Sequence, residues 1–468
     1  MEEVDLIIGA KYIIPIVPSR TYLVDHVIVV KDKKIVDIVK KSQVDEKYKA
    51  KEVVQLGGGA RAGDSDLDEY ILTAGFFNMH CHSAMTLLRG YADDVSLLDW
   101  LTKFIWPAEA KWVGEEFVKL GTELACLEMI KTGTTYANEM YYYPEIAAEV
   151  MENSGMRATV SVPIIKFPTI YANNEAEYLE KGEKFIEQYK SNEMIRPALG
   201  PHAVYTITDE AYLRVKELSE KHNLVIHTHL HETHVEVADE EKLNGKRPLA
   251  RLDGLGVLSE RLIAVHMTQL TKEECQLVAD NKVNVVHCPE SNLKLGVAGI
   301  CPVHQLEKCG VNVCIGTDSA ASNDDLDMLS EMRCAALVDK LCYNMTLKSE
   351  LEPNPQSSGV TPSHRMLSMA TINGAKALGV DKELGSIEIG KFADIVAIKV
   401  TSPPIYDAIS HLVYVGTNRV TDVWVGGKNL LKNTVLQTMN EDEIRKKVIE
   451  FSKKIKDIRP TTGTIVIQ

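Results

Sequence analysis

From about residue 70 onward, apolar runs alternate with amphipathic stretches, and this alternation limits the fold more than any other feature of the chain. Eight of the apolar runs have the length and composition of buried strands: 71–78, 134–139, 158–165, 197–202, 224–229, 262–266, 283–287 and 311–318. The stretches between them include expected helices at 115–131, 175–189, 209–222 and 272–281. Eight strands that are each followed by a helix predict a closed (β/α)₈ barrel of the TIM type. A doubly wound open sheet is the alternative, but its glycine-rich dinucleotide loop is missing.

The two ends of the chain lack this alternation of strands and helices. Short β-like runs separated by polar residues fill 4–55, and similar runs return after residue 380. We therefore expect a small β-sandwich-like domain built from 1–69 and 380–468, with a terminal helix at 441–458, around a barrel at 70–379. The glycine-rich segment 57–68 is expected to be a flexible, exposed loop with no assigned function.

Composition excludes several classes of protein. The formal net charge of −14 disfavours binding to nucleic acid or to an anionic membrane surface, which both require basic residues. No apolar run reaches the length of a membrane span, and the acidic first residues do not resemble a secretory signal. The nine cysteines are scattered without a Cys-x-x-Cys pair, so we expect reduced thiols in a cytoplasmic protein.

Histidines and one aspartate fall at the predicted ends of strands, where the active sites of barrel enzymes lie. They are His80, His82, His202, His229, His266 and Asp318. Side chains alternate along a strand, so the first two histidines point to the same side and can bind one metal ion. A lone His-x-His is as often structural, but scattered core histidines would not collect at strand ends.

Two further motifs leave alternatives open. In 227–234, period two places His227, His229 and His231 on one face, but only one of them can lie at the height of the metal. The others, with His234, are expected to be structural or exposed. An aspartate at position 318 after an apolar strand is costly to bury without a partner, which a cation would supply. A simple helix N-cap is the alternative for Asp318 or Ser322.

Ordered motifs along most of the chain resemble the amidohydrolase superfamily, within it the 5-methylthioadenosine/S-adenosylhomocysteine deaminases and the related triazine chlorohydrolases. The matching segments are 78–90, 100, 106–109, 200–202, 229–233, 287–296, 316–323, 374–379 and 390–394. The resemblance implies a homodimer or larger homo-oligomer and a small heterocyclic substrate.

The resemblance also implies one divalent metal, zinc first with Fe²⁺, Mn²⁺ or Ni²⁺ as alternatives. Its ligands would be His80, His82, His229 and Asp318. No lysine stands at the end of the fourth strand, where binuclear relatives carry a bridging carbamate, and this favours one ion. Proton transfer is assigned to Glu232, His266 and Asp318. Substrate contacts are assigned to Trp100, Glu109, His202, Glu232 and Ser322.

The chemistry of these residue types agrees with a hydrolase. Three neutral imidazoles and a carboxylate leave an open position for water, as catalytic zinc requires. Such a metal lowers the pKa of bound water from about 15.7 to about 7, which is worth about 12 kcal/mol. A general acid or base usually supplies about 3–5 kcal/mol. Asp318 would take the water's proton, Glu232 would protonate a ring nitrogen, and His266 would steady the attacking oxygen before ammonia leaves.

Three functions compete at this stage. The first is deamination of an adenine nucleoside, either 5′-methylthioadenosine, S-adenosylhomocysteine or adenosine, and Glu109 at a ribose-binding position favours it. The second is hydrolysis of another amino- or halo-heterocycle such as guanine, a pterin or a triazine. The third is an inactive barrel that serves as a scaffold, which the retained ligand set disfavours.

The 5′ group of a nucleoside substrate is a separate question. Relatives acting on thio-nucleosides tend to carry arginines near the end of the third strand, but segments 160–163 and 169–174 have none. We therefore expect a neutral 5′ group to be preferred to a zwitterionic amino-acid tail. Trp100 and the tyrosines at 141–143 either wall such a group or serve as packing.

Overall fold

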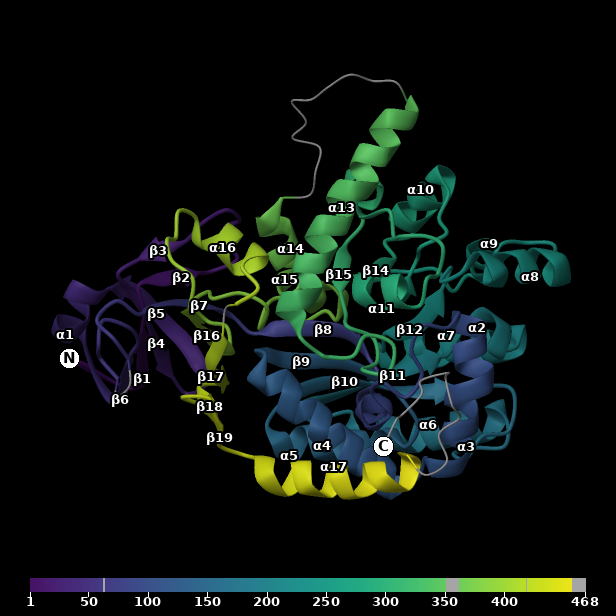
Figure 1. Ribbon diagram of the computed structural model, residues 1–468, viewed down its shortest axis with the longest axis horizontal. Helices are drawn as coiled ribbons and strands as arrows, with labels where there is room; N and C mark the ends of the chain where they lie inside the picture. The colour runs from purple at the N-terminus through teal and green to yellow at the C-terminus, as the bar shows by residue number, and fades with distance from the viewer. Residues whose placement is uncertain (62–63, 351–361, 418, 457–468) are drawn as a thin grey trace, which may run out of the picture. The chain divides into compact units, whose positions relative to one another are not determined.

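The computed structural model describes residues 1–61, 64–350, 362–417 and 419–456 (Figure 1). The chain divides into two compact units. The first consists of Met1–Asn78, Met129–Tyr136 and Asp327–Met439, and the second of Met79–Glu128, Ala137–Leu326 and the chain from Asn440.

The first unit contains two sheets. A four-stranded sheet has the order β5-β4-β1-β6, and a seven-stranded sheet has the order β19-β18-β17-β16-β7-β2-β3. In the larger sheet, β7 from the first part of the chain pairs antiparallel with β16 from the last part, as expected of a β-unit built from both ends. The bounds are β1 Glu2–Gly9, β2 Tyr12–Ile14, β3 Leu23–Val24, β4 His26–Lys31, β5 Lys34–Lys40, β6 Tyr48–Gln55, β7 Glu69–Ala74, β16 Ile395–Val400, β17 Arg419–Val425, β18 Lys428–Lys432 and β19 Val435–Leu436.

The third sheet is the predicted barrel, with eight strands in sequential order from β8 to β15. Neighbouring strands from β10 to β15 run parallel. The backbone N–H of Asp318 donates to the carbonyl of His80 at 2.9 Å, so the segment after β15 reaches the first strand. A Cβ at Gly316 would lie 2.5 Å from His80 N, so this close approach requires glycine. The strands are β8 Phe76–Cys81, β9 Thr134–Met140, β10 Arg157–Ile164, β11 Ile195–Pro201, β12 Ile226–Leu230, β13 Leu262–His266, β14 Asn284–His287 and β15 Val313–Ile315.

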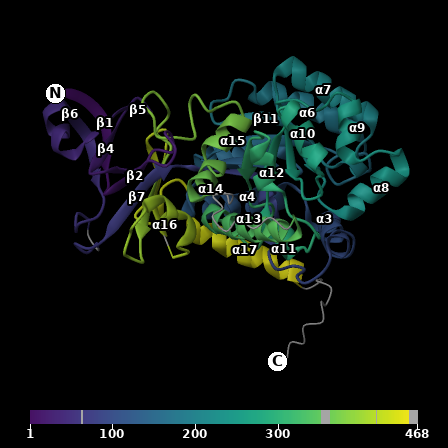
Figure 2. The same cartoon turned by 90° about the horizontal axis from the view of Figure 1, so that it is seen from above.

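Helices follow the barrel strands and pack against them: α5 packs on β10, α6 on β10 and β11, and α7 on β11 and β12. Figure 2 labels α6 and α7 near β11. The described helices include none with the length and apolar character needed to cross a membrane. The α-helices are α1 Val44–Lys47, α2 Leu97–Asp99, α3 Trp106–Trp112, α4 Glu115–Lys131, α5 Pro144–Ser154, α6 Glu175–Tyr189, α7 Asp209–His222, α8 His234–Asn244, α9 Pro248–Gly254, α10 Lys272–Asp280, α11 Pro289–Lys294, α12 Val303–Lys308, α13 Met328–Glu350, α14 Ser363–Met369, α15 Ile372–Ala377, α16 Ala408–Tyr414 and α17 Glu441–Lys456. Shorter helical turns are η1 Lys41–Gln43, η2 Ser83–Leu88 and η4 Val204–Thr206, and η3 Trp100–Ile105 is a π-helical turn.

Local signals explain why several helices begin where they do. The side chain of Asn174 accepts from the backbone of Glu177 at the start of α6, and Thr208 caps α7 in the same way. Thr271 and Glu274 form a capping box at the start of α10. The predicted helices at 115–131, 175–189 and 209–222 accordingly coincide with α4, α6 and α7.

The first predicted strand, 71–78, was wrong as a single element. It joins the end of β7, in the seven-stranded sheet, to the start of β8, in the barrel. The chain changes sheets at Gly75, whose N–H donates to Asp394, while the N–H of Phe76 donates to Gly133. Both strands are buried, so the apolar run continues across the break and hides it.

The compact units also divide the chain differently from the predicted domain limits. The strand β7 lies across the predicted limit at 69/70 and belongs wholly to the first unit. The terminal helix α17 groups with the barrel unit, because its Phe451 packs edge-on against the rings of Trp112 and Phe117. The predicted last strand, 311–318, shortens to β15, so Asp318 lies beyond it with φ of 62°.

Candidate metal centre and active-site cavity

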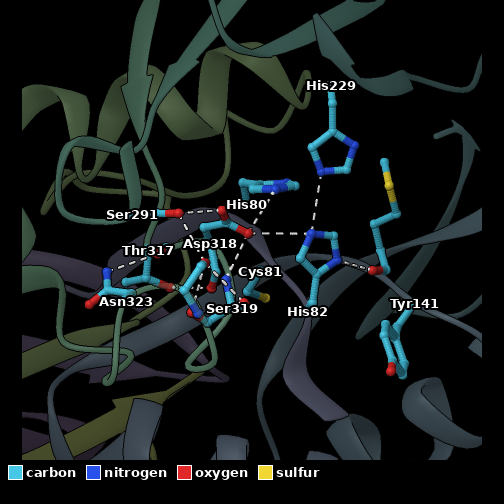
Figure 3. Close-up of polar contacts among 12 residues, drawn as sticks. His80, Cys81, His82, Tyr141, His229, Ser291, Thr317, Asp318, Ser319 and Asn323 are labelled. Atoms are coloured by element: carbon cyan, nitrogen blue, oxygen red, sulfur yellow. Dashed lines mark hydrogen bonds and ion pairs between the residues drawn. The ribbon is translucent and has the colours of Figure 1, made fainter. Parts of the chain in front are cut away.

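Four side chains from three strand ends converge on one point (Figure 3). His80 and His82 come from the end of β8, His229 from β12, and Asp318 from the segment after β15. The Nε2 atoms of both β8 histidines lie 3.4 Å from Asp318 Oδ1, and Nε2 of His82 lies 3.3 Å from Nε2 of His229. Two overlapping groups, one of His80, His82 and His229 and one of His80, His266 and Asp318, each have their possible ligand atoms within 4.8 Å of one another, close enough to share a single ion.

Backbone carbonyls orient two of the imidazoles. Nδ1 of His82 donates to the carbonyl of Met140, and Nδ1 of His229 donates to the carbonyl of His202 at 2.6 Å. With the proton on Nδ1, each ring turns the lone pair of Nε2 toward the convergence point. Hydrogen bonds of this kind set the tautomer and direction of histidines that ligate metals.

The third imidazole, His80, is oriented by other side chains. Its Nδ1 lies 2.9 Å from Nε2 of His227, whose Nδ1 lies 3.2 Å from the hydroxyl of Ser161. Nε2 of His80 is fully buried and has no hydrogen-bond partner among the described residues. A buried polar atom without a partner is costly, and a cation at the convergence point would satisfy it.

The protonation states also suit a cation. Burial lowers the pKa of His80 to about 3 and holds the pKa of His229 well below its usual range, so both rings are neutral. Burial opposes charge on Asp318, but the surrounding histidines, with His80 first, hold the pKa of its carboxyl well below the usual range. The hydroxyl of Ser291 donates to Oδ2 of Asp318 at 2.6 Å, and the N–H of Ser319 donates to Oδ1 at 2.7 Å.

His266, at the end of β13, is held in a different way. The side-chain amide of Asn292 donates to its Nδ1 at 3.0 Å, which leaves the ring proton on Nε2. That Nε2 lies 3.7 Å from Glu232 Oε1 and has no hydrogen-bond partner among the described residues. In this tautomer Nε2 of His266 is a hydrogen-bond donor beside the cluster.

Glu232 follows β12 on a turn that other side chains fix in place. The carboxylate of Glu236 accepts from the backbone N–H of His231 at 2.9 Å and from that of Glu232 at 2.7 Å. The hydroxyl of Thr268 donates to the Glu232 carbonyl at 2.7 Å. Burial, with Asp318 nearby, raises the pKa of Glu232 to about 8, so this side chain holds a proton at neutral pH.

These residues face a cavity of about 90 Å³, measured as the space open to the centres of water-sized spheres. Trp100, from the π-helical turn η3, and Glu109, from the first turn of α3, line it together with His202 and Glu232. The structure thus brings four of the five predicted substrate contacts to the lining of one cavity. The full lining is His82, Met85, Leu97, Trp100, Leu101, Ile105, Trp106, Glu109, Met140, Tyr141, Tyr142, Pro163, Ile165, Phe167, His202, Tyr205, His229, Glu232, His266, Leu295, Asp318 and Ser319.

The fifth predicted contact, Ser322, is not part of this lining. Its side chain is buried, and its hydroxyl lies 2.9 Å from that of Ser291 and 3.0 Å from that of Ser319. Ser322 therefore contacts Ser291 and Ser319, the two residues that donate hydrogen bonds to Asp318, and its hydroxyl faces these neighbours rather than the cavity.

Sequence reasoning did not assign several residues that shape the site. Ser291 and Asn292 lie inside the motif at 287–296, which carried the family resemblance but no role. Glu236 gave no local signal, and Tyr141 was considered only as a wall for the 5′ group or as packing, because the partners of both residues are recognised only when the fold is known. Tyr141 donates to Oε1 of Glu109 at 2.7 Å across 32 positions of sequence.

Comparison with known proteins identifies the family. A sequence model of the amidohydrolase family matches residues 71–430. The chain belongs to the amidohydrolase family. This confirms the expected family, and the expected class of hydrolase acting on a C–N bond agrees with the names of its relatives.

Relatives of this amidohydrolase match over most of its length. A 5-methylthioadenosine/S-adenosylhomocysteine deaminase from Saccharophagus degradans is 40% identical over 455 residues, 96% of this chain and 97% of the relative. A 5′-deoxyadenosine deaminase from Methanospirillum hungatei is 42% identical over 370 residues, 78% of this chain and 79% of the relative. The crystal structure of an adenosine deaminase from Xanthomonas campestris with bound zinc has a TM-score of 0.90 and 39% identity, covering 98% of this chain and all of that one. The likeness confirms the predicted barrel fold.

Proposed function

We propose that this amidohydrolase deaminates adenine ribonucleosides, such as 5′-methylthioadenosine, adenosine or S-adenosylhomocysteine, to the inosine analogue and ammonia. The observation that carries the proposal is the pairing of two carboxylates with different tasks in one cavity. Glu232 holds a proton beside the histidine–aspartate cluster, and Glu109 is a second buried acidic side chain in the same cavity, which we assign to the ribose from the family resemblance. The names of relatives about 40% identical to the chain agree with this activity.

We propose further that His80, His82, His229 and Asp318 hold one divalent ion, with zinc as the first candidate. The orphaned Nε2 of His80 and the neutral imidazoles support this assignment. The related adenosine deaminase structure contains zinc. The bound ion would supply Lewis acidity, which makes water a nucleophile at neutral pH.

Side chains of the protein carry out the proton transfers. Water adds to C6 of the adenine ring, and Asp318 accepts a proton from it. Glu232 donates its proton to the adjacent ring nitrogen, N1, which takes up the electron pair of the C6=N1 double bond as the new C–O bond forms. His266 donates a hydrogen bond from Nε2 to the attacking oxygen. Asp318 then passes the water's proton to the exocyclic amine, and the C6 hydroxyl returns a proton to Glu232. The C–N bond breaks, which releases ammonia and leaves the 6-keto product.

The wall of the cavity favours a neutral 5′ group. Its described lining contains carboxylates and apolar side chains but no lysine or arginine. Pro163, near the end of β10, and Ile165 and Phe167, after it, line the cavity in the region where the family resemblance led us to look for arginines. A zwitterionic amino-acid tail would lose hydration of its carboxylate there without gaining an ion pair.

The first prediction compares substrates. We expect 5′-methylthioadenosine and adenosine to be deaminated with higher kcat/KM than S-adenosylhomocysteine, and Glu109→Ala to impair nucleosides far more than adenine. Ammonia release from the purified, metal-analysed protein measures both effects. If S-adenosylhomocysteine is the best substrate, the argument from the lack of lysine and arginine in the described lining is rejected. If no nucleoside reacts, the screen extends to guanine, pterins and triazines, and deamination of nucleosides is rejected.

Assembly and location are proposed from the family. We propose a homo-oligomer, a dimer or larger, in the cytoplasm. Light scattering at micromolar concentration is expected to give at least twice the 52.0 kDa mass of one chain. A monomeric mass under these conditions would reject the oligomer.

A further inference from the structure

The carboxylate of Glu109 has a hydrogen-bond donor, Tyr141, that has no role in the proposed mechanism. Glu109 is 8% exposed, and the hydroxyl of Tyr141 donates to its Oε1 at 2.7 Å. Among the described residues, Tyr141 is the hydrogen-bond partner of this side chain. Both residues line the cavity. The contact therefore borders the cavity, although both side chains are buried and Tyr141 also packs in a hydrophobic core cluster.

The position of Tyr141 in the fold connects two parts of the site. It directly follows β9, whose last residue, Met140, accepts the hydrogen bond that orients His82. Successive residues of one strand end thus fix the imidazole at the ring-reacting end and the carboxylate at the sugar end. The Tyr141 ring is held by neighbours, at 5.1 Å from the ring of Tyr142 and 6.4 Å from that of His82.

The hydrogen bond has a definite effect on what Glu109 can accept. A carboxylate offers about four lone-pair positions on two oxygens. Tyr141 occupies one position on Oε1 and stops the carboxylate from rotating, which leaves Oε2 and the remaining position on Oε1 for two hydroxyl donors. Burial raises the pKa of Tyr141 well above its usual range, so the phenol keeps the proton that it donates. A vicinal diol supplies two hydroxyl groups at the separation of two carboxylate oxygens.

We propose that Tyr141 is a positioning residue for Glu109 and thereby a determinant of specificity for ribonucleosides over deoxyribonucleosides. The inference rests on the proposed nucleoside deaminase activity. Tyr141 does not touch the reacting atoms; it holds the carboxylate in the orientation that receives both hydroxyls of the ribose. Loss of its hydroxyl should weaken binding of the diol and leave the chemical step unchanged.

The test uses Tyr141→Phe in the full-length, metal-loaded protein, with adenosine and 2′-deoxyadenosine as substrates. We expect the KM for adenosine to rise about tenfold, the effect of losing a hydrogen bond to a charged group, while kcat changes by less than about twofold. The preference for adenosine over 2′-deoxyadenosine should fall by a similar factor. Tyr143→Phe is the matched control, because its hydroxyl donates to the carbonyl of Ile170 and not to Glu109.

A double-mutant cycle separates positioning from packing. In a Glu109→Ala background the added Tyr141→Phe change should alter KM by less than about twofold, because its partner is gone. The proposal is overturned if Tyr141→Phe keeps the full preference for adenosine, or if it impairs both substrates equally in both backgrounds. Circular dichroism and the thermal midpoint of Tyr141→Phe establish that the variant is folded. If the wild-type protein deaminates no nucleoside, it is the proposed function that fails.

Discussion

Replacing Glu232 with glutamine should lower kcat at least about 100-fold while the protein keeps its fold and its metal. Glutamine has nearly the same shape, and the backbone around position 232 is fixed by Glu236 and Thr268 rather than by the side chain that changes. What is lost is the proton that the buried carboxyl holds at neutral pH, its pKa being raised to about 8. Steady-state kinetics with the preferred nucleoside measure the effect.

The control for this variant is Glu241→Gln, which makes the same change on the exposed side of α8. It should leave kcat and KM near their wild-type values. Metal content and the thermal midpoint are measured for both variants, so that loss of metal or fold is not mistaken for loss of proton transfer. If Glu232→Gln retains metal and near-normal turnover, Glu232 has no part in the mechanism.

Removal of the metal should have the largest effect of all. Lewis acidity is worth about 12 kcal/mol in generating the nucleophile, against about 3–5 kcal/mol for a proton donor. Dialysis against a chelator is therefore expected to abolish detectable turnover, and adding back zinc should restore it. Elemental analysis of the purified protein should give about one divalent ion per chain.

A matched pair of histidine variants locates the ion. His229→Ala removes an Nε2 that faces the cluster and should reduce metal content severely. His234→Ala removes an exposed histidine of the same sequence motif and should leave the metal content unchanged. Two ions per chain, full activity in the stripped protein, or equal metal loss in the two variants would each contradict the mononuclear site.

The sequence predicted those parts of the molecule that depend on local pattern. The helices α4, α6 and α7 were found because amphipathic periodicity and caps are properties of neighbouring residues. His80, His82, His229 and Asp318 converge as expected, because the barrel puts every strand end at one rim, and their role as metal ligands, which the family resemblance implied, stays a prediction. The break at Gly75 between β7 and β8 was not predicted, because two buried strands that adjoin in sequence form one apolar run.

Contacts between distant residues account for the other omissions. Glu236 holds the turn of Glu232, and Asn292 sets the tautomer of His266, yet an acidic residue on a helix and an asparagine in a motif have many ordinary roles. Ser322 shows the reverse error, since a polar residue near the motif of Asp318 was assigned to the substrate and is used for support. Side-chain orientation depends on tertiary packing, which spacing along a single sequence does not contain.

The hydrogen bond between Asp318 N and the His80 carbonyl has a consequence for how the barrel folds. The two proposed ligands on either side of this seam are separated by 318 − 80 = 238 positions, so bringing them together carries the loop-closure entropy of most of the barrel. A chain that has folded all but its last strand would hold three imidazoles without the carboxylate. Tight metal binding should therefore come late in folding. The bound ion would stabilise the fully closed barrel relative to partly opened forms.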